Sequence, residues 1–551
     1  MMNFLGTSKS PVFVRDATGL VRSLSIWDAF LFNNWQAGGA WSSLMWISVY
    51  PVWFPQANIL LAMGITVIMS VFTGTVYALA TTVMPRSASD YVFVSRSIAP
   101  AIGLGFGFLN VFWFLVINAW NVYVPTTFIS QTLFSIGAMT GSATLLNGWA
   151  WFSGQTSLLL LLGLGILIIS CLAVMFGLRT YLRTFQMSVN VVSAVAFVII
   201  LFFFLSYSNA DFITRFTQYM SPLSGTPDPY HDIINLASSL GYVPPSGFDW
   251  GQTMAVAVLW WFISLGTVAS SWMGGEVKQA SNIKAQIIAM AGANIFTYVL
   301  ADVFEYLWFN VSGKNWLAAL GYIVSNYPSK VPVWISGAAP YWGAAWVNLM
   351  IGNVPLALIV SLAWILQGFA VITPLILMAS REFFAFSFDR VIPSKFSEVH
   401  ERFRSPVISV IVIGVIMMAG FTFTVYTTWI NFAVAAPMGV LFVTLTISIA
   451  AILFFKTKKN IYELSPVARL KVFGLPLQPL IGVVSAIGIC VGLYYYYGPL
   501  NSLALGGVSA PVSVISLGVF LLGVIGYYVA RQIQLKRGID IAYAFIQIPP
   551  E

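Results

Sequence analysis

The first long apolar stretch of the chain is broken in its middle by residues that could bind a small charged molecule. Within residues 24–50, Asn33–Asn34 and then Gly38–Gly39–Ala40 interrupt the apolar run, which afterwards resumes. Irregular backbone at membrane depth lines a cavity or is buried in protein, because lipid offers its N–H and C=O groups no partner. Glycine also leaves a helix at little cost. The freed N–H groups would attract a carboxylate, and the freed carbonyls an ammonium or Na⁺.

The apolar stretch at residues 251–274 is broken in a similar way, by Ser264, Gly266 and Thr267. It is the sixth such stretch, so five spans separate one break from the next, and the second copy of an odd-numbered repeat inserts upside down. This pattern predicts a five-plus-five inverted repeat with discontinuous helices 1 and 6 and a substrate held between them. The alternative interpretation is that small residues simply pack membrane helices closely.

Neither break has a charged side chain beside it, so the backbone ends would have to recognise the ligand. Such a pair of ends suits a zwitterion, for example an amino acid. Trp261 and Phe262 precede the second break and would either cover the ligand or pack in the core. The candidate substrate-binding residues are Ala37, Gly38, Gly39, Ala40, Trp261, Phe262, Ser264 and Gly266.

The composition predicts that most of the surface faces lipid. The chain has 551 residues, of which 59% are hydrophobic and only 8% charged, against roughly 25% charged in soluble domains. We expect an all-α integral membrane protein with twelve transmembrane helices, the last two following the repeats. The spans are predicted near residues 25–50, 57–82, 100–134, 155–177, 184–208, 251–274, 284–310, 345–380, 406–427, 429–455, 476–498 and 512–534.

The basic residues predict the orientation in the membrane. Only Arg215, Lys314 and Lys330, of 25 Lys and Arg residues, fall outside one alternating set of loops. Because cytoplasmic loops carry the excess of Lys and Arg, both termini are predicted to be cytoplasmic in the cell membrane. The net charge of +8 is distributed over these short loops, which does not favour nucleic-acid binding.

The spans and their connections suggest six segments. The longer outside connections, about 209–250 and 311–344, are rich in Pro, Gly and Trp and are expected to form short helices or lids. The predicted segments are a cytoplasmic tail (1–23), a first five-helix repeat (24–208), an extracellular loop (209–250), a second, inverted repeat (251–455), helices 11 and 12 (456–535) and a cytoplasmic C-terminal tail (536–551).

The residues that usually carry enzymatic chemistry are scarce. The two cysteines, Cys171 and Cys490, lie in apolar spans, and the two histidines, His231 and His400, are far apart in polar connections. Without a cluster of nucleophile, base or metal ligands, the sequence predicts no enzyme, no metal centre and no cofactor. It contains no nucleotide-binding loop either, which disfavours ATP-driven transport.

Three loops resemble motifs of the amino acid–polyamine–organocation superfamily. They follow the second, sixth and eighth predicted spans, and the matching residues are Pro85, Arg86, Ser87, Asp90, Tyr91 and Arg96; Glu276 and Lys278; and Ser380, Arg381, Asp389, Pro393 and Pro406. The resemblance implies a secondary transporter that moves amino acids by alternating access. It also implies that Gly38–Ala40 receives the substrate carboxylate and that Phe262 is a gating aromatic. The alternatives are a polyamine, a nucleobase or another small organic ion as solute, or a permease-like receptor.

The resemblance and the apolar context also suggest how transport is driven. Some proton-coupled relatives carry a lysine in the fifth span, whereas this chain has Ser193 at that place. One hypothesis is a Na⁺ site made of backbone carbonyls near Ala37 and Gly38 with Ser193 and Thr373, all neutral oxygens. Asp302 and Glu305, one turn apart in the seventh span, could carry protons or select cationic substrates. Alternatively, they are solvated carboxylates at a helix end.

The charged residues of the three loops have a possible role of their own. Opposite charges there could form ion pairs that close a cytoplasmic gate and exchange partners during transport. The alternative is ordinary loop charge with weak surface pairs. The residues concerned are Arg86, Asp90, Arg96, Glu276, Arg381 and Asp389.

Overall fold

The computed structural model describes residue 20 and residues 22–36, 53–336, 343–427, 429, 435–505 and 509–546. For residues 35, 36, 262–265, 336, 504, 505 and 509 it describes the backbone alone. The predicted substrate-binding residues Ala37, Gly38, Gly39 and Ala40 therefore lie outside the described part of the chain. The first predicted span is described only at its start, helix α1 (Ile26–Gln36).

Eleven helical segments of the described chain are long and apolar enough to cross a membrane, and they correspond to the second to twelfth predicted spans. A bilayer core of about 30 Å needs about 20 helical residues. The segments are α4 (Ile59–Val83), α6 (Pro100–Thr140), α8 (Thr156–Met175), α9–η1–α10 (Leu178–Ser206), α13–η2 (Trp250–Trp272), α14–η4–α15 (Ile283–Ser312), α19 (Val354–Phe388), α20 (Val407–Val425), α21 (Ala436–Thr457), α23 and part of η9 (Leu477–Leu503), and most of α24 (Ala510–Lys536).

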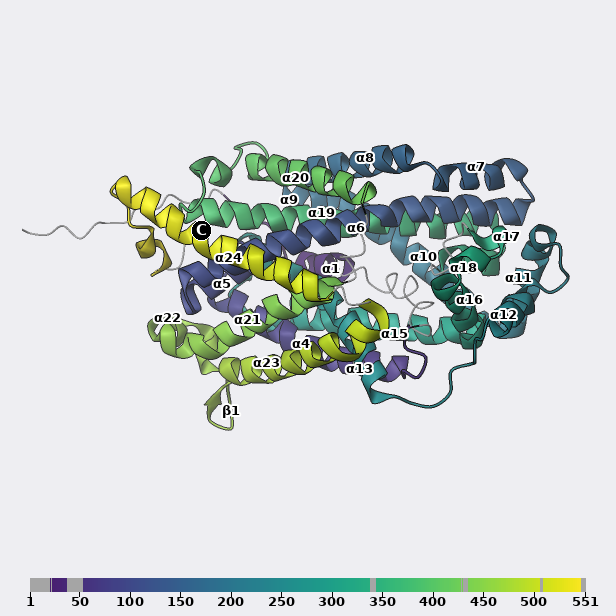
Figure 1. The fold of residues 1–551 in the computed structure, drawn as a ribbon. Coiled ribbons are helices and arrows are strands. Elements are labelled where there is room, and N and C mark those ends of the chain that lie inside the picture. Colours follow the sequence, from purple (N-terminus) through teal and green to yellow (C-terminus); the bar gives the residue numbers. More distant parts are fainter. Residues whose placement is uncertain are drawn as a thin grey trace, which may run out of the picture.

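The two longest helices, α6 and α19, pack against each other through the middle of the bundle (Figure 1). Each contains an internal proline, Pro125 in α6 and Pro374 in α19. A side chain at Gly368 would overlap the ring of Pro125, so the two helices approach where only glycine fits.

The predicted eighth span, residues 345–380, is wrong at both ends. Its first residues form a separate helix, α18 (Ala344–Ile351), which ends at Gly352 with a φ of +61°. The Asn353 side chain then accepts the Leu356 N–H and begins α19, which continues to Phe388. Hydropathy alone placed the end too early because the last turns of α19 carry polar residues that are buried by protein.

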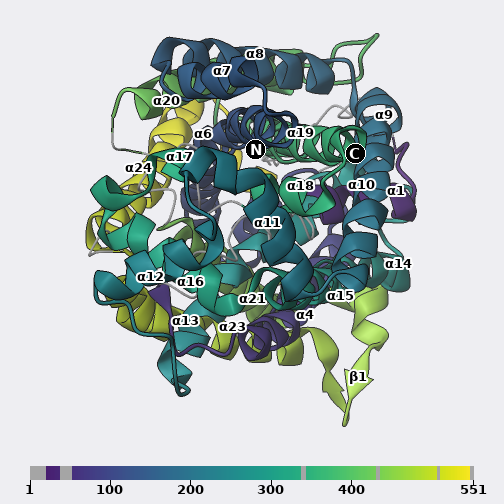
Figure 2. The same cartoon turned by 90° about the vertical axis from the view of Figure 1, so that its right-hand side faces the viewer.

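One end of the bundle, on the right in Figure 1 and facing the viewer in Figure 2, is covered by short helices. Most of them come from the connections 209–250 and 311–344, which we expected to form short helices or lids. Residues 143–153 instead lie between the third and fourth predicted spans, and most of α18 lies in the predicted eighth span. The rings of these helices form one aromatic cluster around Phe212, Phe216, Tyr230, Trp316 and Trp346. The helices are α7 (Ala143–Ser153), α11 (Asn209–Ser224), α12 (Pro229–Ser239), α16 (Lys314–Asn326), η5 (Pro328–Lys330), α17 (Val333–Ser336) and α18.

The opposite end carries most of the basic loops, and we call it the basic end (Figure 1, left). It contains the one departure from a helical fold in the described chain, a two-stranded hairpin. Its elements are α5 (Ser89–Ser97), η3 (Gly274–Glu276), η6 (Ser394–Ser397), α22 (Lys459–Leu464), η8 (Pro466–Arg469), β1 (Lys471–Val472), β2 (Leu475–Pro476) and η10 (Ile541–Phe545).

Candidate functional site

The sixth span changes its helix type at the predicted break. The α-helix α13 ends at Trp261, and Phe262–Trp272 continues as the 3₁₀ helix η2. A 3₁₀ run of this length is unusual, because its hydrogen bonds are poorer than those of an α-helix. The backbone of the sixth span is therefore irregular around Gly266, in a region whose described side chains are buried.

The last turns of α1 lie against this irregular segment. The side-chain amide of Asn33 donates to Ser270 Oγ at 2.9 Å and to the carbonyl of Ala289 at 2.6 Å. Its Oδ1 accepts the backbone N–H of Ser270 at 2.7 Å. A single fully buried asparagine thus joins the first span to the 3₁₀ part of the sixth.

Two further contacts extend this polar layer to α15. Thr297 Oγ1 donates to Asn34 Oδ1 at 2.7 Å, and Thr267 Oγ1 donates to Asn294 Oδ1 at 2.5 Å. We refer to Asn33, Asn34, Thr267, Ser270, Asn294 and Thr297 as the polar seam. Sequence reasoning identified Asn33–Asn34 and Thr267 as markers of the breaks but missed their partners. The signal for the partners was their polarity within apolar spans, where such residues commonly hydrogen-bond across helices.

The structure places the other predicted substrate-binding residues less directly. Gly266 is buried in η2, while Phe262 and Ser264 are described by backbone only. The indole of Trp261 points toward α23, since a side chain at Gly492 would lie 3.2 Å from Trp261 Cζ3. The Trp261 ring therefore packs against the neighbouring helix α23.

The residues of the hypothetical sodium site come from two helices that pack together, α10 (Met187–Ser206) and α19. Ser193 and Thr373 are both fully buried, and neither hydroxyl has a hydrogen-bond partner. Unsatisfied buried hydroxyls are costly, and neutral oxygens of this type suit a hard cation. Both hydroxyls are the type of oxygen that the sodium hypothesis requires, and the backbone carbonyls that it also requires lie outside the described residues.

The two carboxylates of α15 differ in environment. Glu305 is fully buried, and neither of its carboxylate oxygens has a hydrogen-bond partner. Asp302 is only partly buried. The interpretation of Glu305 as a solvated carboxylate at a helix end does not fit this burial.

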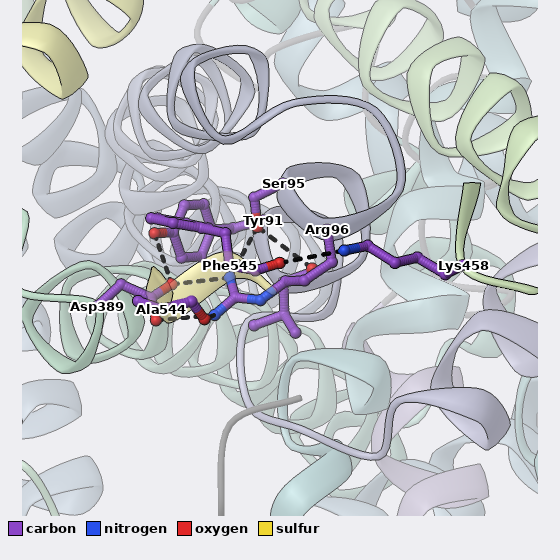
Figure 3. Close-up of polar contacts among 8 residues, drawn as sticks. Tyr91, Ser95, Arg96, Asp389, Lys458, Ala544 and Phe545 are labelled. Atoms are coloured by element: carbon purple, nitrogen blue, oxygen red, sulfur yellow. Dashed lines mark hydrogen bonds and ion pairs between the residues drawn. The ribbon is translucent and has the colours of Figure 1, made fainter. Parts of the chain in front are cut away.

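At the basic end, the structure brings Arg96 of α5 together with Asp389 at the end of α19 (Figure 3). The guanidinium makes two contacts of 2.7 Å with the carboxylate, and the Tyr91 hydroxyl donates to the same carboxylate at 2.8 Å. Both charged side chains are almost completely buried. This pair differs from a surface pair, because both side chains are buried and the planar guanidinium makes two separate contacts with the carboxylate.

The C-terminal segment covers this ion pair, which sequence reasoning did not foresee (Figure 3). The ring of Phe545 lies 4.7 Å from the Arg96 guanidinium carbon, within range of a cation–π interaction. The Lys458 ammonium donates to the Phe545 carbonyl at 3.4 Å. The segment is held in turn by Asp540, whose carboxylate binds Arg531 at 3.1 Å.

The remaining predicted gate residues are only partly paired as expected. Arg381, inside α19, donates through Nε to Glu276 at 2.9 Å, and both are buried. Arg86 Nη1 donates to the carbonyl of Pro85 at 2.9 Å. Asp90 forms no ion pair within the described chain, and instead accepts hydrogen bonds from Tyr77 and Asn110 at 3.0 Å each.

These features describe a multi-pass helical membrane protein with an irregular, polar centre and a buried charged layer at one end. A family model described as amino acid permease matches residues 52–522. The chain therefore belongs to the amino acid permease family, which confirms the resemblance noted in its loops and makes it a transporter family member rather than an enzyme.

No curated protein sequence matches the chain significantly. Among solved structures, the crystal structure of MhsT in complex with L-phenylalanine aligns with 14% sequence identity and a TM-score of 0.49, covering 86% of this chain and 99% of the other.

Proposed function

We propose that this permease is a secondary active transporter that carries amino acids across the cell membrane by alternating access. Its substrate would be held where helices 1 and 6 are interrupted, between a first repeat at residues 24–208 and an inverted second repeat at 251–455. The observation that carries this proposal is the polar seam, in which Asn33 bonds to Ser270 of η2. The seam joins α1, which precedes the predicted break in helix 1, to the 3₁₀ part of helix 6.

The chemistry of these segments favours a zwitterion. η2 has no ionisable residue, and the polar atoms that join it to α1 are neutral amides and hydroxyls. Recognition would therefore rest on backbone groups, with N–H ends for a carboxylate and carbonyl ends for an ammonium. Gly38–Ala40 of helix 1 would provide the close backbone approach.

The basic end would be the cytoplasmic side, with both termini there. The Arg96–Asp389 and Glu276–Arg381 pairs would then close an inner gate, because they join α5 and η3 to the end of α19 while buried from water. Opening this end toward the cytoplasm would require these contacts to separate or exchange partners. Helices 11 and 12 would support this side from outside the repeats.

Two observations bear on the identity of the coupling ion and of the transported solute. The unpartnered hydroxyls of Ser193 and Thr373 support Na⁺ as a coupling ion. The buried and unpartnered carboxylate of Glu305 favours, as a second candidate, a cationic solute such as a basic amino acid or a polyamine.

Uptake into proteoliposomes tests the proposal, using a panel of labelled amino acids and polyamines under separate H⁺ and Na⁺ gradients. Gly39→Val should abolish substrate binding and uptake while the protein remains folded in the membrane. Gly165→Val is a matched control, since a side chain at Gly165 would meet open space. Unchanged binding in Gly39→Val would reject the site, and saturable binding without uptake would identify a receptor.

A further inference from the structure

Next to the gate ion pairs lies a buried network with two carboxylates and no cation. The amide of Asn110 in α6 donates to Asp90 Oδ2 of α5 at 3.0 Å and lies 3.5 Å from Glu382 Oε1 of α19. One asparagine side chain thus bridges two acids that are 292 residues apart in the chain. Both acids are buried, with exposures of 1% for Asp90 and 0% for Glu382.

The network is extended on both sides by neutral donors from other elements. Tyr77 of α4 donates its hydroxyl to Asp90 Oδ2 at 3.0 Å. Trp272, the last residue of η2, donates its indole N–H to Glu382 Oε1 at 2.9 Å. The network therefore connects the irregular sixth span, which carries the proposed substrate site, to α5, α6 and α19.

Each carboxylate has one oxygen that nothing satisfies. Asp90 Oδ1 and Glu382 Oε2 are buried and have no hydrogen-bond partner. An unpartnered carboxylate oxygen in an apolar interior is expensive for an anion and much cheaper for a protonated group. These two atoms are where a proton would bind.

The surrounding charged groups do not compensate the pair. On the same helices, Arg96 binds Asp389 and Arg381 binds Glu276. Among the elements packed on α5, η2 has no ionisable side chain, α4 contributes only the neutral Tyr77 hydroxyl, α6 has Tyr123 as its one ionisable residue, and Lys456 of α21 is exposed. Two facing anions without a cation would repel each other as well as lose their hydration.

Burial acts in the same direction on Asp90, which lies in the short helix between two spans. It raises the pKa of the Asp90 carboxyl to about 7, although the bonds from Asn110 and Tyr77 oppose the rise. The carboxyl can therefore gain or lose a proton near physiological pH.

We propose that Asp90, Asn110 and Glu382 form a proton-binding site that couples H⁺ movement to the transport cycle. With the basic end closed, one proton from the outer solution binds an otherwise unpartnered oxygen and leaves that carboxyl neutral. When η2 moves to open the cytoplasmic side, the Trp272 contact is lost and water enters, so the carboxyl releases the same proton to the cytoplasm. One H⁺ is bound and one is released per cycle, with no other bond made or broken. This inference rests on the proposed transport function.

The test compares Glu382→Gln with the wild-type protein in proteoliposomes that contain a pH-sensitive dye. In wild type, an inward H⁺ gradient should drive accumulation of the substrate, and substrate should carry H⁺ inward. Glu382→Gln should reduce accumulation to the level without a gradient and abolish the dye signal. It should still exchange labelled for unlabelled substrate at equal pH, because exchange does not need proton release. Glu463→Gln, an exposed acid at the same end, should behave like wild type.

The outcomes separate this inference from the proposed function. Wild-type uptake without any H⁺ movement, or H⁺ movement retained in Glu382→Gln, would overturn the proton site and leave the transporter intact. Absence of binding and uptake in wild type under every gradient would instead reject transport itself. If Glu382→Gln fails to fold, Tyr77→Phe provides the second measurement. In Tyr77→Phe, the pH at which uptake is half-maximal must move to a higher value. A purely structural role of Tyr77 would lower the uptake rate without moving this midpoint.

Discussion

Helix α5 presents charged residues to two buried environments that differ in one respect. Arg96 faces Asp389, whereas Asp90 faces Glu382 through Asn110. Both aspartates accept a tyrosine hydroxyl, from Tyr91 at 2.8 Å and from Tyr77 at 3.0 Å, and Asp90 accepts the Asn110 amide as well. The difference is the guanidinium, which is present beside one carboxylate and absent beside the other.

This difference determines whether a buried carboxylate stays charged in an ion pair or takes up a proton. A buried carboxylate with a bidentate arginine stays charged, and the pair must be pulled apart to open the gate. A buried carboxylate without a cation lowers its energy by taking up a proton instead. The two environments therefore give one short helix two functions, a contact that holds the basic end closed and a site that responds to H⁺.

The largest effect should come from breaking the compensated pair. Asp389→Asn leaves Arg96 buried without an anion, and removal of one partner of a buried ion pair costs about 3–5 kcal/mol. We expect a clear fall in the thermal unfolding temperature of the purified protein in detergent. The double variant Arg96→Met with Asp389→Asn should recover much of the loss. An unfolding temperature equal to that of wild type would show that the pair does not hold this end together.

The uncompensated site should respond in the opposite way to the same kind of change. Glu382→Gln replaces a buried acid by a neutral group of similar shape, so we expect the unfolding temperature at pH 8 to stay equal to or rise above that of wild type. The measurement is the same thermal scan as for Asp389→Asn. A loss as large as in Asp389→Asn would mean that Glu382 is charged and paired in the folded state.

The sequence was a good guide to the spans but a poor guide to this contrast. Apolar stretches of about 20 residues are unambiguous, and the loop motifs singled out Asp90, Arg96 and Asp389. The sequence alone could not identify the Arg96–Asp389 ion pair, because the two residues are 293 positions apart in the chain. The gate hypothesis treats all the loop charges alike, whereas in the described part of the structure Asp90 bonds to Tyr77 and Asn110 and not to an arginine. The predicted eighth span ends at residue 380, eight residues before the end of α19, so Glu382 falls outside it.

The irregular backbone of the sixth span could be predicted from the sequence, but its hydrogen-bond partners could not. Gly266 and Thr267 indicated irregular backbone in the sixth span, where η2 lies. Which neighbours satisfy such a backbone depends on helix packing, and the bonds from Asn33 to Ser270 and Ala289 join segments more than 230 residues apart. The prediction for Gly38–Gly39–Ala40 falls outside the described residues and remains a prediction.

A smaller effect should distinguish Tyr77 from Tyr91, namely a shift in the pH at which uptake is half-maximal. The Tyr77 hydroxyl favours the charged form of Asp90, so Tyr77→Phe should raise the pKa of Asp90 above its value of about 7. If transport requires the protonated site, uptake falls as the pH rises through this pKa, and the midpoint should move to higher pH in Tyr77→Phe. Tyr91→Phe should leave the midpoint unchanged, because Asp389 stays paired with Arg96. The measurement is initial uptake between pH 5 and 9, and equal shifts in both variants would contradict the contrast.

The smallest effect should come from the C-terminal segment over the compensated pair. Phe545→Leu keeps an apolar side chain there but removes the ring from the Arg96 guanidinium, a cation–π contact worth about 0.5–2 kcal/mol when it is desolvated. We expect a modest fall in the unfolding temperature and, because the closed basic end is weakened, a rise in the initial uptake rate. The pH midpoint should not move, since Phe545 lies against Arg96 and Tyr91 of the compensated pair. A shifted midpoint with an unchanged unfolding temperature would place Phe545 in the proton site and remove the distinction between the two environments.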